Sequence, residues 1–366
     1  MPHSHIESAC NLGLQAARLA SPNPSVGCVI TDKNGEVLGQ GHTQQAGGPH
    51  AEVMALRDAA SRGHAVAGAT AYVTLEPCSH HGRTPPCCDA LIAAGLKKVV
   101  ISIQDPNPLV AGQGIARLRA AGIEVEVGPG AAESRELNIG FFSRMIRKSP
   151  WVRMKIAASL DGKTALMNGQ SQWITGEAAR ADGHAWRARS SALLTGIGTV
   201  LTDRPQLDVR LVQTLRQPDV VVVDSRLETP LDAPLFIADR RRFIYAAERN
   251  DHKQAALEAS GATVIYKPGT NGKVDLAAML QDLAAREVNE LHVEAGHKLN
   301  GSLIRENLVD EVLFYLAPKL LGTAQGMASF GPLQALSEAI ELEFLSADKV
   351  GADLRVRARV AGRDQF

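Results

Sequence analysis

Four residues in the first quarter of the chain have the types and the spacing of a catalytic metal site. His50 and Glu52 stand two positions apart, and Cys78 and Cys87 follow them. A catalytic zinc ion takes three protein ligands and keeps a fourth position for water, whose pKa falls to about 7. We predict that His50, Cys78 and Cys87 are these ligands and that Glu52, which is not a ligand, moves protons.

This arrangement is typical of zinc-dependent deaminases that act on heterocycles, in which H-x-E is followed by P-C-x-x-C. The chain departs from the pattern because residues 79–86 separate Cys78 from Cys87. His81 and Cys88 therefore remain alternative third ligands, although the two prolines before Cys87 favour it by starting a helix there. The competing interpretation is that the histidine and the cysteines are ordinary buried residues.

The secondary structure expected around these residues brings them to one place. We predict a helix over 51–60 that starts beside His50, a strand over 71–75 that ends before Cys78, and a helix over 87–94. Because a helix start lowers the pKa of a thiol, we expect a thiolate at Cys87. Two helix starts and one strand end therefore converge on the metal site.

The composition limits the class of protein. The 366 residues suffice for two domains, and 39 basic and 39 acidic side chains give a formal net charge of zero. Without a basic excess, a small-molecule substrate is favoured over nucleic acid. The five cysteines, at positions 10, 28, 78, 87 and 88, suit metal binding in a reduced, cytoplasmic compartment. No apolar run is long enough for a membrane span, so we expect no membrane partner.

Alternating helices and strands predict an α/β fold in both halves of the chain. In the first half we also expect helices over 6–19, 114–121 and 131–147, and strands over 26–31, 36–41, 99–103 and 123–127. After a junction at 148–150, we expect strands over 151–157, 192–195, 220–224, 242–246, 263–266 and 290–294, and helices over 176–190, 253–259 and 276–286. These apolar strands indicate a mostly parallel sheet, completed by antiparallel strands over 308–316, 342–350 and 353–360.

Longer motifs resemble the bifunctional deaminase/reductase family of riboflavin biosynthesis, over nearly the whole chain. They are Ser21-Pro22-Asn23-Pro24, Pro49-His50-Ala51-Glu52, and the segments 75–87, 155–163 and 171–175. The resemblance implies a cytidine-deaminase-like α/β/α domain over 1–147, which uses one zinc ion to deaminate 2,5-diamino-6-(5-phosphoribosylamino)pyrimidin-4(3H)-one. It implies a dihydrofolate-reductase-like α/β domain over 148–366, which reduces the ribosyl group of the product to ribityl with NADPH. It also implies a homo-oligomer, either a dimer or a tetramer.

The resemblance further implies site residues, position by position. Deaminase substrate contacts are Asn23, His42, His80, Arg83 and Asn107. Reductase substrate contacts are Ser171, Arg187, Leu207, Arg210 and Glu294, of which the two arginines suit a phosphate. Lys155 and Asp161 are either catalytic or structural. Cofactor contacts are Ala157, Trp173, Thr199, Asp203, Ser225, Gly296, His297, Lys298, Leu299, Asn300, Gly301 and Ser302, and the glycines among them suit a close approach of the backbone to phosphate.

Other interpretations are weaker. Gly196-Ile197-Gly198 looks like the start of a G-x-G-x-x-G dinucleotide fingerprint, but Leu201 stands where the third glycine belongs. A deaminase of nucleosides or nucleic-acid bases is the rival enzyme, and a non-catalytic zinc domain is the rival of another class. Glu52 argues against the latter, because a structural zinc normally takes four ligands and needs no proton shuttle.

Overall fold

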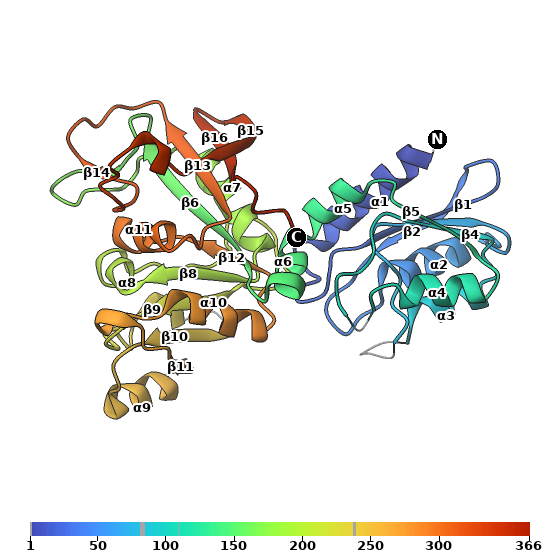
Figure 1. Ribbon diagram of the computed structural model, residues 1–366, viewed down its shortest axis with the longest axis horizontal. Helices are drawn as coiled ribbons and strands as arrows, with labels where there is room; N and C mark the ends of the chain where they lie inside the picture. The colour runs from blue at the N-terminus through green and yellow to red at the C-terminus, as the bar shows by residue number, and fades with distance from the viewer. Residues whose placement is uncertain (1, 81–84, 109, 237–238) are drawn as a thin grey trace. The chain divides into compact units, whose positions relative to one another are not determined.

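The computed structural model describes residues 2–80, 85–108, 110–236 and 239–366. The chain divides into two compact units, Met1–Arg147 and Lys148–Phe366, and each has its own sheet (Figure 1). Among the described helices, none combines the length and the apolarity that crossing a membrane requires.

The first unit contains a five-stranded sheet in the order β2-β1-β3-β4-β5. β1 pairs antiparallel with β2 and β3, whereas β3, β4 and β5 run parallel. The predicted strands are confirmed, with bounds that shift by one or two residues. They are β1 (Gly27–Thr31), β2 (Val37–His42), β3 (Thr70–Val73), β4 (Lys98–Ile101) and β5 (Glu124–Val127).

Helices cover both faces of this sheet. Gly27 and Gly41 point to opposite faces, and each lacks a side chain where a helix comes close. A Cβ atom at Gly27 would lie 1.8 Å from the Ala9 carbonyl oxygen of α1 (Pro2–Ala16), and one at Gly41 would lie 2.5 Å from the Ala55 nitrogen of α2 (Ala51–Ser61). The predicted α/β/α layers are thus confirmed. The unit also contains α3 (Cys87–Ala93), α4 (Gln113–Ala120), α5 (Ala131–Leu137) and α6 (Ile139–Arg147).

The helix predicted over 131–147 is two helices, which meet at Asn138. This residue leaves the helical conformation, with φ −114° and ψ 22°. Its side-chain oxygen accepts a hydrogen bond from Ser25 N at 2.7 Å, and its side-chain nitrogen donates to Ser25 O at 2.9 Å. Asparagine side chains compete with helices for backbone partners in this way. The prediction of one helix was wrong because the competing partner lies far away in the sequence.

The second unit contains a nine-stranded sheet in the order β11-β10-β9-β8-β12-β6-β13-β16-β15. It is parallel from β11 to β13 and antiparallel from β13 through β16 to β15, as predicted. A small antiparallel pair, β7 (Lys163–Ala165) with β14 (Gln325–Gly326), was not predicted. The main strands are β6 (Trp151–Ser159), β8 (Ala192–Gly196), β9 (Asp219–Val223), β10 (Arg242–Ala246), β11 (Thr263–Tyr266), β12 (Glu290–Val293), β13 (Glu311–Ala317), β15 (Leu342–Val350) and β16 (Asp353–Val360).

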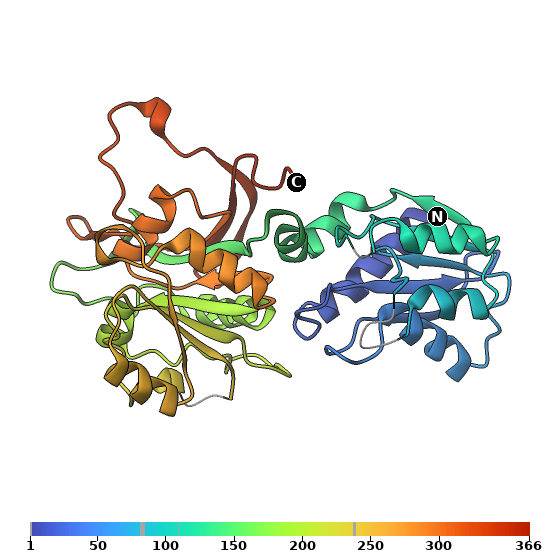
Figure 2. The ribbon, with the colours of Figure 1, turned by 60° about the horizontal axis from the view of Figure 1, so that its bottom comes forward.

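Helices lie on both sides of this sheet (Figure 2), and their apolar side chains pack against it in two core clusters. Met279 of α10 and Leu303 of α11 pack with one set of alternate strand residues, and Val200 of α8 and Leu257 of α9 pack with the other set. The short helices α8 and α11 were not predicted as helices. The helices of this unit are α7 (Glu177–Arg189), α8 (Ile197–Asp203), α9 (Asp251–Ala259), α10 (Leu276–Ala285) and α11 (His297–Arg305).

Charged side chains are buried near the amino ends of three neighbouring strands. Arg153 of β6, whose side chain is 0 % exposed, pairs with Glu290 of β12 at 2.6 Å and with Glu311 of β13 at 2.8 Å. Arg189 of α7 lies 3.0 Å from Glu290, and Arg357 of β16 lies 3.1 Å from Glu311. Although burial opposes it, the charges of Arg189 and Arg153 lower the pKa of Glu290 to about 2. The charges are therefore buried as a paired group.

Candidate active sites

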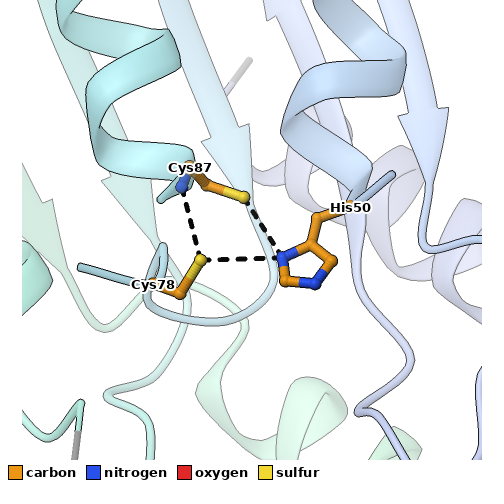
Figure 3. A group of neighbouring side chains, drawn as sticks. All are labelled: His50, Cys78 and Cys87. Atoms are coloured by element: carbon orange, nitrogen blue, oxygen red, sulfur yellow. Dashed lines mark hydrogen bonds between the residues drawn. The ribbon is translucent and has the colours of Figure 1, made fainter. Parts of the chain in front are cut away.

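Three side chains meet between two helix starts and a strand end (Figure 3). His50 precedes α2, Cys87 begins α3, and Cys78 follows β3. His50 Nδ1 lies 3.2 Å from Cys87 Sγ and 3.6 Å from Cys78 Sγ, and the three possible ligand atoms all lie within 4.8 Å of one another. The three residues predicted as metal ligands are thus brought together.

The donor set fits zinc. Tetrahedral zinc, with Zn–N and Zn–S bonds of roughly 2.1 and 2.3 Å, holds its nitrogen and sulfur ligands about 3.6 Å apart. The separations from His50 Nδ1 to the two sulfur atoms are 3.2 and 3.6 Å. One nitrogen and two sulfur ligands leave a fourth position open, as catalytic zinc sites do.

The two thiols differ in acidity. The hydrogen bond from Cys87 lowers the pKa of Cys78 to about 4. The same bond, together with burial, raises the pKa of Cys87. Zinc binds cysteine as the thiolate, so a thiolate at Cys87 in the metal-bound site stays a prediction.

Of the two alternative metal ligands, Cys88 is among the described residues and His81 is not. The Cys88 thiol turns to the backbone, where it donates to Pro77 O at 3.3 Å and lies 3.6 Å from Gly114 O. His81 lies outside the described residues, as does Arg83, the predicted substrate contact.

Glu52 lies in the first turn of α2, beside the metal ligands. Its side chain is buried, and burial raises its pKa, against the opposing effect of the His50 charge. A carboxyl group with a raised pKa is suited to proton transfer near neutral pH. The position and the environment of Glu52 thus match the predicted role.

The other predicted contacts of the first unit lie in four segments. Asn23 follows α1, His42 ends β2, His80 lies two residues past Cys78, and Asn107 follows β4. His80 is exposed and the other three are half-buried. Burial lowers the pKa of His42, which favours a neutral imidazole at pH 7. Contact of these residues with a substrate stays a prediction.

In the second unit, Glu294 is the centre of a cluster of charges just past β12. Arg187 of α7 binds it with two parallel hydrogen bonds, from Nε to Oε1 at 2.5 Å and from Nη2 to Oε2 at 2.8 Å. Lys155 Nζ lies 4.0 Å from Oε2, and His292 Nε2 lies 3.5 Å from Oε1. Although burial opposes it, the Arg187 charge lowers the pKa of Glu294 well below its usual value. Burial lowers the pKa of Lys155.

The two predicted phosphate contacts have different surroundings. The Arg187 side chain is 15 % exposed and also donates to Asp208 O at 2.9 Å. The Arg210 side chain is 51 % exposed and pairs with the Asp208 carboxylate. His184 lies between them, because its Nε2 is 3.5 Å from Arg187 Nη1 and its Nδ1 accepts a hydrogen bond from Arg210 N at 3.2 Å. The sequence reasoning missed His184, which its spacing of three from Arg187 on a helix could have indicated.

Several predicted cofactor residues lie at the carboxyl ends of four neighbouring strands, β9, β8, β12 and β6, where α/β sheets bind ligands. Thr199 belongs to α8, which follows β8 directly, and Gly296 precedes α11. A Cβ atom at Gly296 would lie 3.6 Å from Thr199 Oγ1, so the first turns of α8 and α11 are neighbours. Ser225 follows β9, and Ala157 lies in β6. The free N–H groups of a helix start suit a phosphate.

Gly301 has a reason to be glycine other than the one expected. A Cβ atom there would lie 1.9 Å from Ser329 O, so this glycine lets the chain near residue 329 pack on α11. Asn300 Nδ2 supports the same packing by donating to Met327 O at 3.0 Å. The close approach at Gly301 is therefore to the protein's own backbone.

The remaining predicted contacts are varied. Trp173 is 64 % exposed, with the Arg180 guanidinium 4.6 Å from its ring centre, and Ser171 is half-buried two residues before it. Asp203 is exposed at the end of α8. Leu207 has a φ of 50° and a buried side chain, so a ligand there would meet its backbone.

Asp161 has a structural role. Its carboxylate accepts hydrogen bonds from Ser159 Oγ at 2.5 Å and from Gly322 N at 2.8 Å. These bonds, with another from Leu321 N, lower the pKa of Asp161 to about 2. Asp161 therefore joins the turn after β6 to the segment after β13, whereas Lys155 faces Glu294.

Comparisons with known proteins match both units of the chain. The profile of the cytidine and deoxycytidylate deaminase zinc-binding region matches residues 3–103, and that of the RibD C-terminal domain matches residues 150–356. The riboflavin biosynthesis protein RibD of Escherichia coli is 44% identical over 364 residues, which cover 96% of this chain and 97% of that protein. The protein of the same name from Aquifex aeolicus is 38% identical over 351 residues, covering 96% of each.

Solved structures give the same result. Acinetobacter baumannii RibD (form 1) superposes with a TM-score of 0.89 at 39% identity, covering 98% of each chain. A Thermotoga maritima diaminohydroxyphosphoribosylaminopyrimidine deaminase/5-amino-6-(5-phosphoribosylamino)uracil reductase superposes with a TM-score of 0.86 at 32% identity, covering 99% of each chain. The chain therefore belongs to the RibD family of riboflavin biosynthesis, and it is an enzyme with a zinc-binding deaminase region and a reductase domain.

Proposed function

We propose that residues 1–147 deaminate 2,5-diamino-6-(5-phosphoribosylamino)pyrimidin-4(3H)-one and that residues 148–366 reduce the ribosyl group of the product to ribityl. The observation that carries the proposal is the triangle of His50, Cys78 and Cys87 beside the buried carboxyl group of Glu52. The substrate is taken from the Thermotoga maritima relative, which is named as a deaminase and reductase of these compounds.

In the deaminase site, His50, Cys78 and Cys87 would hold one zinc ion. Zinc in such a site lowers the pKa of a water molecule at its open fourth position to about 7. Glu52 takes a proton from the attacking water and gives it to the departing amino group. Its raised pKa suits both steps, because the carboxyl group must lose and regain a proton near neutral pH.

Binding of the pyrimidine is assigned to five side chains of the first unit, all of them by resemblance to the family. They are Asn23, His42, His80, Arg83 and Asn107. The neutral imidazole of His42 can accept or donate a hydrogen bond to the edge of the heterocycle.

In the reductase site, the neighbouring starts of α8 and α11 would hold the phosphates of NADPH, which supplies a hydride. Thr199 and Gly296 lie at this place. The substrate would lie near Glu294 and Lys155, whose half-buried carboxylate and amine can bind ribosyl hydroxyl groups. Arg187 holds Glu294 in place through its two hydrogen bonds. Arg210, with its exposed guanidinium, is assigned to the 5′-phosphate.

We also propose that the chain forms a homo-oligomer through the second unit. Support comes from large apolar side chains that are exposed between residues 320 and 345, because a second copy of the chain could cover them. They are Leu320, Phe330, Leu333, Leu336, Ile340, Leu342, Phe344 and Leu345. Light scattering of Phe344→Glu tests this assignment, and an unchanged molar mass would contradict it.

The proposed function is tested with the purified full chain. Mass analysis should find one zinc ion per chain, and the pyrimidine substrate should release ammonia and then support NADPH oxidation. Release of ammonia from cytidine or from single-stranded DNA, without release from the pyrimidine phosphate, would favour the rival deaminase. Zinc without any deamination would favour a structural zinc domain. A cytoplasmic location stays a prediction.

A further inference from the structure

Glu76 is a buried carboxylate in the deaminase unit to which the mechanism above assigns no role. Its side chain is 3% exposed. Oε2 accepts hydrogen bonds from Asp105 N at 3.2 Å and Gly112 N at 2.9 Å, and Oε1 accepts from Gly114 N at 2.9 Å and Ile115 N at 3.1 Å. Bonds from backbone N–H groups to a carboxylate are charge-assisted and strong. Within the described residues, the Glu76 carboxylate thus accepts hydrogen bonds from four backbone N–H groups, all in the segment from Asp105 to Ile115.

That segment carries Asn107, which is proposed to contact the substrate. Asp105 Oδ1 accepts from Asn107 N at 2.8 Å, and Asn107 O accepts from Ala111 N at 2.9 Å. Asn107 therefore lies between two anchor points, Asp105 and Gly112, and both are held by the same oxygen of Glu76. The Glu76 carboxylate thus binds the chain on both sides of Asn107.

On its other side Glu76 is tied to a proposed zinc ligand, because only Pro77 separates it from Cys78. The start of α4 packs directly on this turn, since a Cβ atom at Gly114 would lie 2.1 Å from Pro77 O. The Cys88 thiol, which donates to Pro77 O at 3.3 Å, braces the turn from α3. The zinc-ligand turn and the Asn107 segment thus form one hydrogen-bonded unit around Glu76.

We propose that Glu76 is a positioning residue of the deaminase: its carboxylate sets the place of Asn107 relative to Cys78 and thereby the affinity for the pyrimidine. The inference rests on the proposed function of this site. The positioning role requires both carboxylate oxygens of Glu76, because a glutamine amide at this position would turn its N–H₂ group toward two backbone N–H donors. Aspartate keeps both oxygens but is one methylene shorter.

The test compares Glu76→Gln and Glu76→Asp in the full chain. The matched control is Glu126→Gln, which removes an exposed carboxylate of β5 that pairs with Lys98 in the same unit. We expect Glu76→Gln to keep its zinc and to raise KM for the pyrimidine by at least about tenfold, since one lost charge-assisted bond corresponds to roughly that factor. The change in kcat should be smaller, and Glu76→Asp should recover part of the loss. NADPH oxidation with deaminated substrate, and the control variant, should be unchanged.

A double-mutant cycle with Asn107→Ala separates positioning from general stability. If Glu76 acts through Asn107, Glu76→Gln should add little to the defect of Asn107→Ala. Defects that multiply, a wild-type KM, or loss of zinc from Glu76→Gln would each overturn the proposal.

Amide hydrogen exchange in the wild-type chain covers the case in which the variants do not fold. The N–H of Gly112 should exchange slowly, and exchange at the rate of an open loop would overturn the proposal. A wild-type chain that reduces but does not deaminate would instead contradict the proposed function.

Discussion

Arg187 and Arg210 should respond differently to replacement by alanine, because the Arg187 side chain is largely shielded from solvent and the Arg210 side chain is exposed. Arg210 is 51 % exposed beside Asp208, whereas Arg187 is 15 % exposed and bound twice to Glu294. An exposed ion pair contributes about 0–1 kcal/mol, and breaking a buried pair costs about 3–5 kcal/mol. We therefore expect Arg210→Ala to change the free energy of unfolding by less than about 1 kcal/mol and Arg187→Ala to lower it by about 3 kcal/mol or more.

The effects on reduction follow from the same difference. A charge-assisted bond from Arg210 to the 5′-phosphate contributes about 1.5–3 kcal/mol, which corresponds to roughly tenfold to 150-fold in kcat/KM. Arg210→Ala should lose this factor with the phosphorylated substrate and little with the dephosphorylated one. Arg187→Ala should lower kcat/KM for both substrates, because the Glu294 carboxylate then lacks the guanidinium group that orients it.

The assay is NADPH oxidation at varied substrate concentration, together with denaturant unfolding. Arg204→Ala is the matched control, because Arg204 is 48% exposed and pairs with Asp232 in the same unit. If Arg210→Ala lowers kcat/KM equally for the phosphorylated and the dephosphorylated substrate, the arginine is structural and the phosphate binds elsewhere. If Arg187→Ala is as stable as the control, the two bonds to Glu294 contribute no stability and the reasoning from burial is refuted.

Three further outcomes are expected. Glu52→Gln should keep its zinc and deaminate about 10²–10⁴-fold more slowly, as measured by ammonia release, and loss of the metal would contradict this. Cys78→Ala should stop deaminating yet still oxidise NADPH with deaminated substrate, whereas a folded variant without reductase activity would refute separate sites. Burial, and then the Arg187 charge, lower the pKa of His184 to about 4. Because an unfolded histidine titrates near 6.5, the unfolded chain takes up the proton first, and up to about 3 kcal/mol of stability should be lost as the pH falls from 6.5 to 4. His184→Gln should remove this pH dependence of thermal unfolding, and an unchanged dependence would exclude the assignment.

The strands, and the three side chains that the structure brings together as possible metal ligands, were predictable because their signals are local. A short apolar run between two predicted helices, such as Val220 to Val223, indicates a buried strand. One histidine and two cysteines at the spacing of His50, Cys78 and Cys87 are seldom found together in a purely structural role. The substrate and cofactor contacts of the reductase were predicted from the resemblance to a known family, because no local sequence pattern identifies them.

What the sequence did not reveal depends on distant partners. Asn138 breaks its helix because of Ser25, and Glu76 binds N–H groups that any residue type can offer. Arg187 meets Glu294 across 107 positions, so its burial as a pair was not visible in the sequence.

The buried charges around Arg153 also select one alignment of the parallel strands. Arg153 stands directly opposite Glu311 in the ladder of β6 and β13, and it reaches Glu290 diagonally on β12. Successive side chains of a strand point to opposite faces, so a slip of β6 by one residue would turn Arg153 away from both carboxylates. The buried guanidinium of Arg153 would then lose both carboxylates, each of which would keep one arginine partner, at a cost of about 3–5 kcal/mol for each broken pair. Apolar strands alone tolerate such slips, and the paired charges make misaligned sheets of this unit unfavourable.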